Sequence, residues 1–180
     1  MKKNIVLTGK PGIGKSTVIK RVIQTLDPER LGGFWSAEIR ENNRRVGFSL
    51  ITLSGEKGVL AHVDLNRGPR VGKYFVSIED LEAIAIPALA RARVRGQIIV
   101  IDEIASMELH SPRFAPEVRR CLDTGKVLAT LQQRKGGFQD EVRTREDVFL
   151  IDVKLENRDI LPQEVLSRLD GCNYPLRVRK

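Results

Sequence analysis

One segment near the start of the chain restricts the fold more than any other: Gly9-Lys10-Pro11-Gly12-Ile13-Gly14-Lys15-Ser16. It directly follows an apolar run, residues 4–8, and directly precedes a helical pattern over residues 17–26. Glycines let successive backbone N–H groups curl around a phosphate without Cβ clashes. The helix that follows presents its N-terminal donors and the positive end of its dipole to the same anion. This order of strand, glycine-rich turn and helix predicts a phosphate-binding loop, with nucleotide contacts from Gly9 through Thr17.

Two side chains at the end of this loop have the chemistry that a nucleoside triphosphate requires. Lys15 is expected to reach the β- and γ-phosphates, and the Ser16 hydroxyl is expected to bind Mg²⁺. The alternative is a tight turn that only caps a helix. That alternative explains Gly14 but not the Lys15-Ser16 pair, so we predict a catalytic role for Lys15 and a metal-binding role for Ser16.

A second signal, this time acidic, lies on a later strand. Residues 98–101 are four consecutive apolar residues, and Asp102-Glu103 follow them. An apolar strand that ends in an acid is the Walker B pattern, so Asp102 is the second predicted Mg²⁺ ligand. Glu103 is expected to orient and deprotonate the attacking water. The alternative is a solvated acidic pair at a strand end, but the intact phosphate loop favours a place for both acids in the nucleotide site.

Three further residues are accessory candidates. Glu108 follows Glu103 closely and is a candidate to support the Mg²⁺ shell. Thr130 ends the next apolar strand, where a polar group can sense the γ-phosphate, although a β-branched residue also simply suits a strand. Charge on the γ-phosphoryl group in the transition state usually needs an arginine as well. Any single arginine is more often a surface residue; the candidates are Arg113, Arg145 and the preferred one, Arg158.

The remaining pattern predicts an α/β fold on one mostly parallel sheet, because short apolar runs alternate with helical patterns. Residues 33–76, between the first helix and the next long one, consist of short strands and turns and are expected to form a β-rich insertion. We expect one domain over residues 1–170 and a short basic tail over 171–180. Expected strands cover residues 5–7, 34–40, 45–53, 59–63, 74–76, 98–101, 127–131 and 148–153, and expected helices cover 16–26, 78–95, 111–122 and 163–169.

Composition sets the broad class of protein. The chain has 180 residues, of which 41% are hydrophobic and 30% are charged, and no apolar stretch approaches the roughly 18 residues of a membrane span. No signal-peptide pattern is visible, so a cytoplasmic location without a membrane partner is expected. The net charge of +8 is scattered and aromatic residues are few, so nucleic-acid binding is left open but not favoured. Cys121 and Cys172 are expected to be reduced thiols. The oligomeric state is also left open, with a monomer slightly favoured.

Beyond the two motifs, several segments carry a family resemblance: residues 7–9, 33–40, 45–48, 71–74, 101–109, 145–148 and 156–159. On these segments the chain resembles the small nucleoside-triphosphatases first associated with thermophiles, also called the cancer-related nucleoside-triphosphatase family. The resemblance runs from Ile5 to about Leu169. It implies a RecA-like P-loop fold with a β-rich insertion, and slow Mg²⁺-dependent hydrolysis of several nucleoside triphosphates to diphosphate and phosphate. The chain departs from the family pattern at Ala37, at Ala105-Ser106 and at Leu131-Gln132.

The leading hypothesis is therefore a Mg²⁺-dependent nucleoside-triphosphatase. No base-reading motif is visible, which predicts that ATP, GTP, CTP and UTP are all accepted, and no arginine is assured, which predicts a slow rate. The alternatives are a nucleotide or small-molecule kinase, which should carry an Arg-rich lid, and a nucleic-acid-stimulated ATPase. A regulatory GTPase is disfavoured, because residues 157–160 and 102–105 lack its base-reading and switch patterns.

Overall fold

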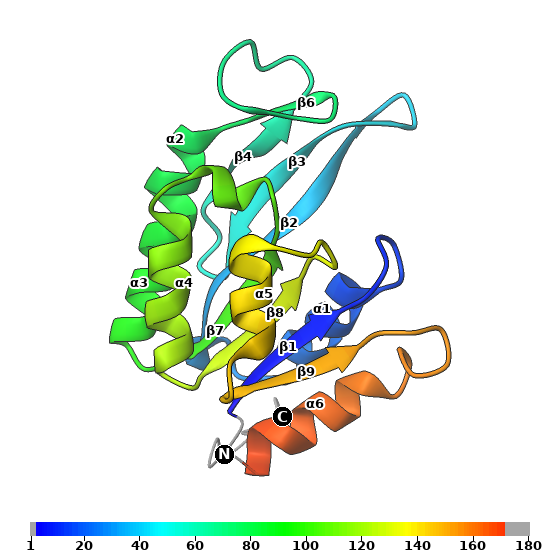
Figure 1. The fold of residues 1–180 in the computed structure, drawn as a ribbon, viewed down its shortest axis with the longest axis vertical. Coiled ribbons are helices and arrows are strands. Elements are labelled where there is room, and N and C mark those ends of the chain that lie inside the picture. The colour runs from blue at the N-terminus through cyan, green and yellow to red at the C-terminus, as the bar shows by residue number, and fades with distance from the viewer. Residues whose placement is uncertain (1–2, 172–180) are drawn as a thin grey trace.

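One mixed sheet with helices on both faces forms the framework of the protein (Figure 1). The computed structural model describes residues 3–171. Its strands are β1 (Asn4–Thr8), β2 (Leu31–Glu41), β3 (Arg44–Thr52), β4 (Lys57–His62), β5 (Arg70–Val71), β6 (Tyr74–Val76), β7 (Ile98–Ile104), β8 (Val127–Leu131) and β9 (Val148–Asp152). Its helices are α1 (Lys15–Thr25), α2 (Ile78–Asp80), α3 (Ile86–Val94), α4 (Phe114–Asp123), α5 (Gly137–Thr144) and α6 (Leu161–Gly171), with short helical turns η1 (Pro28–Arg30), η2 (Leu81–Ala85) and η3 (Glu108–His110).

Half of the sheet is parallel, in the order β2-β7-β8-β1-β9. Both β1 and β8 are buried along their whole length, as expected for strands that are covered on both faces. β8 separates β1, which leads into the phosphate loop, from β7, which carries Asp102. The carboxyl ends of parallel strands meet at one edge of a sheet, where ligand sites of such folds form. The topology thus brings both sequence motifs to the same edge, although their strands are not neighbours.

The other half of the sheet continues antiparallel from β2 through β3, β4, β6 and β5. Pairing of β2 with β7 ends where Trp35 lies opposite Asp102, whereas its pairing with β3 continues to Glu41. The chain turns at Asn42-Asn43 with φ values of 47° and 63°, as in a two-residue type I′ turn, which joins the strands expected over residues 34–40 and 45–53. Residues 36–41 therefore extend beyond the parallel edge and form a wall with β3, which we call the β2–β3 hairpin. The β-rich segment predicted over residues 33–76 lies in this antiparallel half, except for residues 33–35, which pair with β7.

Helices cover the two faces of the sheet and divide the core into two main clusters. On one face, Leu89 of α3 and Phe114 of α4 pack in the same cluster as Val142 of α5 (Figure 1). On the other face, Val22 of α1 packs in one cluster with Val165 of α6. Among the described residues, no helix is both long enough and apolar enough to span a membrane.

Several elements differ from the prediction for identifiable physical reasons. The strand expected over residues 34–40 begins earlier, at Leu31, and runs so close to β7 that a Cβ on Gly33 would lie 2.1 Å from the Val100 carbonyl oxygen. The predicted helix 78–95 is interrupted by the π-type turn η2 just before Pro87, whose missing N–H cannot complete a regular α-helical ladder. Ser77 caps its start by accepting a hydrogen bond from the Asp80 amide. The helix α5 and the two-residue strand β5 were not predicted.

The basic tail predicted over residues 171–180 falls outside the described residues from 172 on, and so does Cys172. Cys121 is buried and free, and burial raises the pKa of its thiol to about 12. Such a thiol stays protonated at neutral pH, as the prediction of a reduced cysteine requires.

Candidate active site

The phosphate loop connects β1 to α1 and has the conformation that its glycines allow. Gly9, Gly12 and Gly14 all have positive φ, and Gly14 at +114° is the residue that precedes the first turn of α1. The amide of Val18 bonds to the Gly14 carbonyl oxygen at 3.0 Å, so the helix begins directly at the end of the loop. No side chain caps this helix start, which leaves its N-terminal backbone donors available to an anion.

Lys15 joins the phosphate loop to the end of β7. Its Nζ donates to the Gly9 carbonyl oxygen at 3.1 Å and lies 3.2 Å from Oε1 of Glu103. The side chain is almost fully buried, at 10% exposure, whereas Glu103 keeps 28% exposure. The predicted catalytic pair is therefore in contact, and its positive charge lies at the cleft on the carboxyl edge of the sheet.

Asp102 is the most buried acid of the site and is held by two hydroxyl groups. Its Oδ1 accepts from Ser16 Oγ at 3.0 Å and from Thr130 Oγ1 at 2.6 Å. Its Oδ2 is buried without a hydrogen-bond partner among the described residues. Burial raises the pKa of Asp102, while the two hydroxyl donors and the charges of Lys20 and Lys15 act in the opposite direction.

These contacts fit a hard divalent cation. Mg²⁺ prefers hydroxyl and carboxylate oxygens and is usually bound by one or two protein ligands together with substrate phosphates. The Ser16 hydroxyl and the Asp102 carboxylate touch each other, and the orphaned Oδ2 is an acceptor that a cation would satisfy. The two predicted metal ligands are thus side by side, as the sequence motifs required.

Glu103 combines partial exposure with a perturbed pKa. Burial raises the pKa of this carboxyl, the ion pair with Lys15 lowers it, and the nearby negative charge of Asp102 raises it again. A carboxylate with a raised pKa is a better base than an ordinary glutamate. Glu103 therefore has both the position and the basicity that the removal of a proton from water requires.

Glu108 lies in η3, just after β7, and is only 2% exposed. Burial, together with the charges of Glu103 and Asp102, raises its pKa to about 8. Its Oε2 has no hydrogen-bond partner among the described residues. A carboxyl with this pKa is protonated at neutral pH, and a neutral acid is a weak ligand for Mg²⁺. Support of the Mg²⁺ shell by Glu108 stays a prediction from the sequence.

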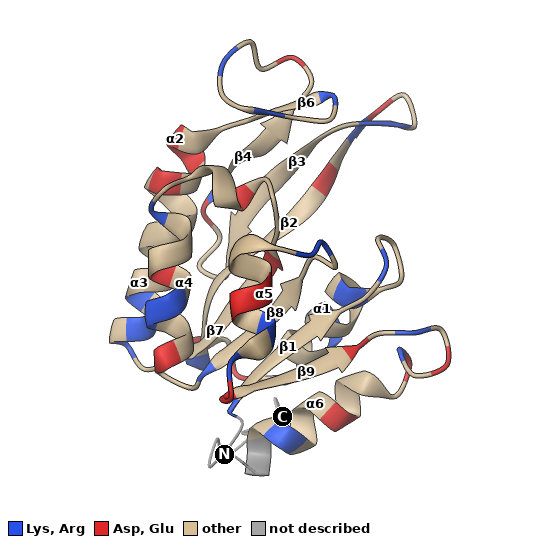
Figure 2. Ribbon diagram, viewed as in Figure 1, with Lys and Arg blue, Asp and Glu red and all other residues tan. Residues whose placement is uncertain are grey.

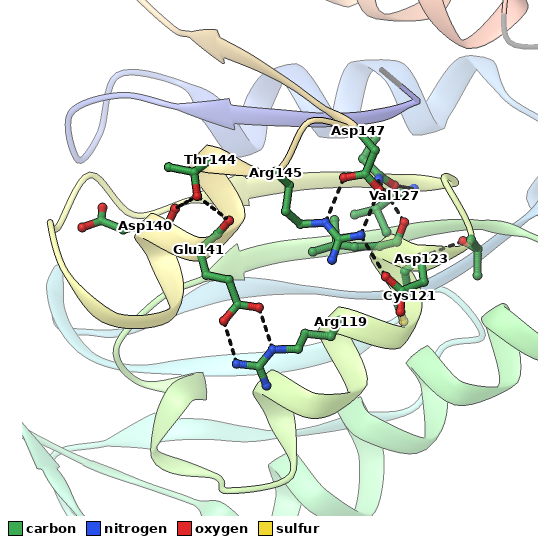
Figure 3. Close-up of polar contacts among 12 residues, drawn as sticks. Arg119, Cys121, Asp123, Val127, Asp140, Glu141, Thr144, Arg145 and Asp147 are labelled. Carbon is green, nitrogen blue, oxygen red and sulfur yellow. Dashed lines mark hydrogen bonds and ion pairs between the residues drawn. The ribbon is translucent and has the colours of Figure 1, made fainter. Parts of the chain in front are cut away.

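The three arginines proposed from the sequence are all outside the cleft that Asp102 and Glu103 line. Arg113 lies 3.6 Å from Glu82, and Arg145 is bound to Asp123 and Asp147 at the opposite end of the sheet, as Figure 3 shows. Arg158 donates to the Ile13 carbonyl oxygen at 3.4 Å and lines a separate groove of about 200 Å³ with Gly14 and Thr17.

The cleft itself has a volume of about 680 Å³ and three walls. The phosphate loop and the start of α1 form the first wall, and the β2–β3 hairpin forms the second. The third wall is the segment after β8. Besides the predicted residues, the lining includes residues that the sequence analysis did not propose for the site: Lys20, Ser36, Ala37, Glu38, Arg45, Phe48, Gln132, Gln133 and Arg134.

Only one of these additional residues carried a usable sequence signal. Lys20 follows Ser16 by four residues on α1, and residues four apart lie on the same helix face. The hairpin residues and Arg134 reach the cleft through strand order, which local patterns do not encode. Two departures from the family pattern also meet here, because the Ser106 amide donates to Oε1 of Gln132 at 3.2 Å.

In Figure 2, the positions of Lys and Arg are interspersed with those of Asp and Glu along the helices, the loops and the hairpin. Many of them are paired, as Arg119 is with Glu141 at 2.6 Å. This arrangement agrees with the prediction that the net charge is scattered.

Comparisons with known proteins place this site in a family. A family model described as NTPase matches residues 4–166. The chain belongs to this NTPase family. It is 42% identical over 166 residues to nucleoside-triphosphatase THEP1 of Thermotoga maritima, covering 92% of this chain and 94% of that protein. It is 36% identical over 183 residues to the human cancer-related nucleoside-triphosphatase, covering 93% and 96%.

A solved structure supports the same conclusion for the fold. The crystal structure of THEP1 from the hyperthermophile Aquifex aeolicus matches with a TM-score of 0.85 at 35% identity, over 93% of this chain and 99% of that one. The family resemblance and the α/β P-loop fold class predicted from the sequence are therefore confirmed.

Proposed function

We propose that this protein hydrolyses nucleoside triphosphates to nucleoside diphosphate and phosphate, with Mg²⁺, slowly and with loose base choice. The observation that carries the proposal is the convergence of four side chains on one cleft. Ser16 touches Asp102, and Lys15 touches Glu103. Nothing in a merely structural P-loop would require an ion pair and an unsatisfied carboxylate oxygen at the same edge.

The metal is assigned to Ser16 and Asp102, whose oxygens match its preference. When bound, Mg²⁺ supplies positive charge to the phosphate oxygens. Burial raises the pKa of Asp102, and the positive charge of Lys20 partly offsets this rise.

The chain's own residues perform the remaining tasks. Backbone N–H groups of residues 9–16 bind the polyphosphate. Lys15 exchanges its contact with Gly9 and Glu103 for phosphate oxygens, which frees the Glu103 carboxylate to face solvent. Glu103 then orients a water in line with the γ-phosphorus and accepts its proton as the new P–O bond forms and the bond to the β-phosphate oxygen breaks. The proton leaves with the phosphate product.

The nucleoside end is assigned to the groove beside Arg158. Gly14 and Thr17 line this groove, whereas Asp102 and Glu103 line the main cleft. The groove is small and open, and its polar side chains are Thr17, Arg21, Arg158 and Asp159. No amide side chain lies there to read a base edge through paired donor and acceptor groups. This favours loose choice among the four common nucleotides.

The test is to measure diphosphate and phosphate together from the purified protein, with each of ATP, GTP, CTP and UTP, with Mg²⁺ and with excess chelator. We expect both products in equal amounts from all four nucleotides, at rates within about tenfold of each other because no group selects the base. Chelator should stop release. Diphosphate without matching phosphate would indicate transfer to an acceptor, and no product from any nucleotide would contradict the proposal. The cytoplasmic location, the preference for a monomer and the disfavoured nucleic-acid role stay predictions from the sequence.

A further inference from the structure

The cleft contains more positive charge than the phosphate loop supplies. Outside that loop, three basic side chains line it: Lys20 from α1, Arg45 from the β2–β3 hairpin and Arg134 from the segment after β8. The γ-phosphoryl group needs added positive charge in its transition state, and an arginine provides two donors in a planar fork. Which of these side chains can contact a phosphate depends on the contacts that each one already makes.

Arg45 is already bound to its own hairpin and to β6. Its Nε donates to the Tyr74 hydroxyl at 3.0 Å, and its NH1 donates to Oε1 of Glu38 at 2.9 Å. The guanidinium also lies 5.1 Å from the centre of the Phe48 ring. Reaching a phosphate would break these contacts, so Arg45 is best explained as a structural part of the hairpin wall.

Lys20 belongs to the metal side of the cleft. It lies one helical turn beyond Ser16, and its charge acts on Asp102. Its ammonium is a compact point charge without the planar fork of an arginine, so Lys20 is the weaker candidate to contact the transferred phosphoryl group.

Arg134 differs from Arg45 in its contacts. Among the residues that the structure describes, it has no hydrogen-bond or ion-pair partner, and its side chain is exposed at the cleft. It belongs to the exposed segment 133–136 that connects β8 to α5, which we call the 133–136 loop. β8 is the strand whose Thr130 donates to Asp102, so this loop begins beside the catalytic acids.

Both ends of the 133–136 loop are fixed. At the first end, the Gln132 amide donates to the Ile104 carbonyl oxygen at 3.1 Å, and its side chain accepts from the Ser106 amide. At the other end, the Gly136 amide donates to Oδ2 of Asp140 at 2.6 Å. Arg134 is therefore a long, exposed cationic side chain on a short loop with anchored ends, and it lines the same cleft as Lys15.

We propose that Arg134 is a catalytic residue whose guanidinium donates to the γ-phosphoryl oxygens as the bond to the β-phosphate breaks. The proposal rests on the proposed triphosphatase function. It also accounts for slow turnover, since an exposed arginine must be ordered from solution in every cycle and this ordering costs side-chain entropy.

The first test compares Arg134→Ala with Arg134→Lys and with Lys135→Ala, a matched control for the adjacent basic residue, which does not line the cleft. We expect Arg134→Ala to lower kcat by about 10²-fold, with KM changed by less than about threefold, because the contact forms mainly in the transition state. Arg134→Lys should restore part of the rate, added guanidinium ion should rescue Arg134→Ala, and Lys135→Ala should match the wild type. The loop is exposed, so the folded fraction, checked by circular dichroism, should not change.

A second readout uses binding alone. With Mg²⁺ and ADP, Arg134→Ala should weaken the aluminium fluoride complex, which mimics the transition state, by about tenfold or more, and leave the beryllium fluoride complex, which mimics the ground state, unchanged. An active wild type with an equally active Arg134→Ala variant would overturn the role of Arg134 only. A wild type that releases no phosphate would overturn the proposed function and this role with it.

Discussion

The carboxyl groups at the two ends of the sheet have pKa values shifted in opposite directions. At the amino end, Arg145 donates from Nε and NH2 to both carboxylate oxygens of Asp147 at 2.9 Å, and NH2 also donates to Asp123 at 2.8 Å (Figure 3). This pairing lowers the pKa of Asp147. At the carboxyl end, burial raises the pKa of Asp102, Glu103 and Glu108 instead.

The difference separates charges that are part of the fold from charges that are available to a ligand. The amino-end acids have their partners within the chain. Of the carboxyl-end acids, Asp102 and Glu108 each keep a buried oxygen without a hydrogen-bond partner among the described residues. Buried polar atoms are normally satisfied, and exceptions together with raised pKa values concentrate at functional sites. The contrast supports the proposal that the carboxyl end is the reacting end.

The largest expected effect is on turnover and comes from a substitution at the carboxyl end. Lys15→Ala should lower turnover by about 10²–10³-fold, because it removes the buried positive charge beside Glu103. Arg119→Ala, which removes an exposed ion pair with Glu141 between α4 and α5, is the matched control and should leave phosphate release unchanged. Equal loss of activity in both variants would mean that the effect of Lys15→Ala does not come from its place in the cleft.

The next largest effect is on stability and comes from a substitution at the amino end. Asn4 is fully buried and bonds to the Leu122 carbonyl oxygen, to Asp147 and to the Val127 amide. Asn4→Ala should lower the free energy of unfolding by about 2–4 kcal/mol, because buried partners are left unsatisfied. Urea unfolding measures this loss, and kcat per folded molecule should be unchanged. A stable variant with low kcat would place Asn4 in the reaction.

Glu108 allows the comparison to be tested through the pH dependence of stability. Its folded pKa of about 8 exceeds the ordinary value of 4.5, so between these values the unfolded chain is ionised while the folded chain binds a proton. Wild-type stability should therefore fall as pH rises through this window, by about 1.4 kcal/mol per pH unit from this group. Glu108→Gln lacks this term, so its stability advantage over the wild type should grow from pH 5 to pH 7. A constant difference across these unfolding curves would contradict the raised pKa.

Asp147 gives the smallest effect, with the opposite sign. Its folded pKa lies below the ordinary value of 3.8, so its contribution to stability is present above that value and is lost as pH falls through the folded pKa. The side chain is 35% exposed, so the advantage of the wild type over Asp147→Asn should be under about 1 kcal/mol at pH 7. Unfolding at pH 7 and pH 3 should show this advantage shrink in acid. An advantage that grows in acid would mean that Asp147 is not a stabilising carboxylate.

The parts of the site that the sequence predicted are those that local patterns encode. The phosphate loop and Asp102-Glu103 are each contiguous, and parallel topology brings them together once the strands are assigned. The Ser77 cap and the Asn42-Asn43 hairpin were predictable for the same reason, since each depends on residues within one turn.

The parts that the sequence missed depend on long-range placement. The preferred arginine, Arg158, lines a different groove, while Arg134 reaches the cleft because β8 lies between β1 and β7. The helix α5 has only eight residues, of which Gln139 and Val142 are buried, so too few apolar residues mark it as a helix in the sequence. Strand order places Arg134, and α5 is a mostly polar helix. Neither feature is encoded by a short sequence motif.

The most direct test of the account is nucleotide binding and phosphate release measured on Glu103→Gln beside the wild type. Glutamine keeps the size of the side chain but cannot accept a proton from water. We expect Mg²⁺-dependent ATP binding within about threefold of the wild type and phosphate release lowered by about 10²-fold or more, because only the base is removed. Unchanged phosphate release with normal binding would contradict the role of Glu103 as the base and, with it, the distinction between the two ends of the sheet.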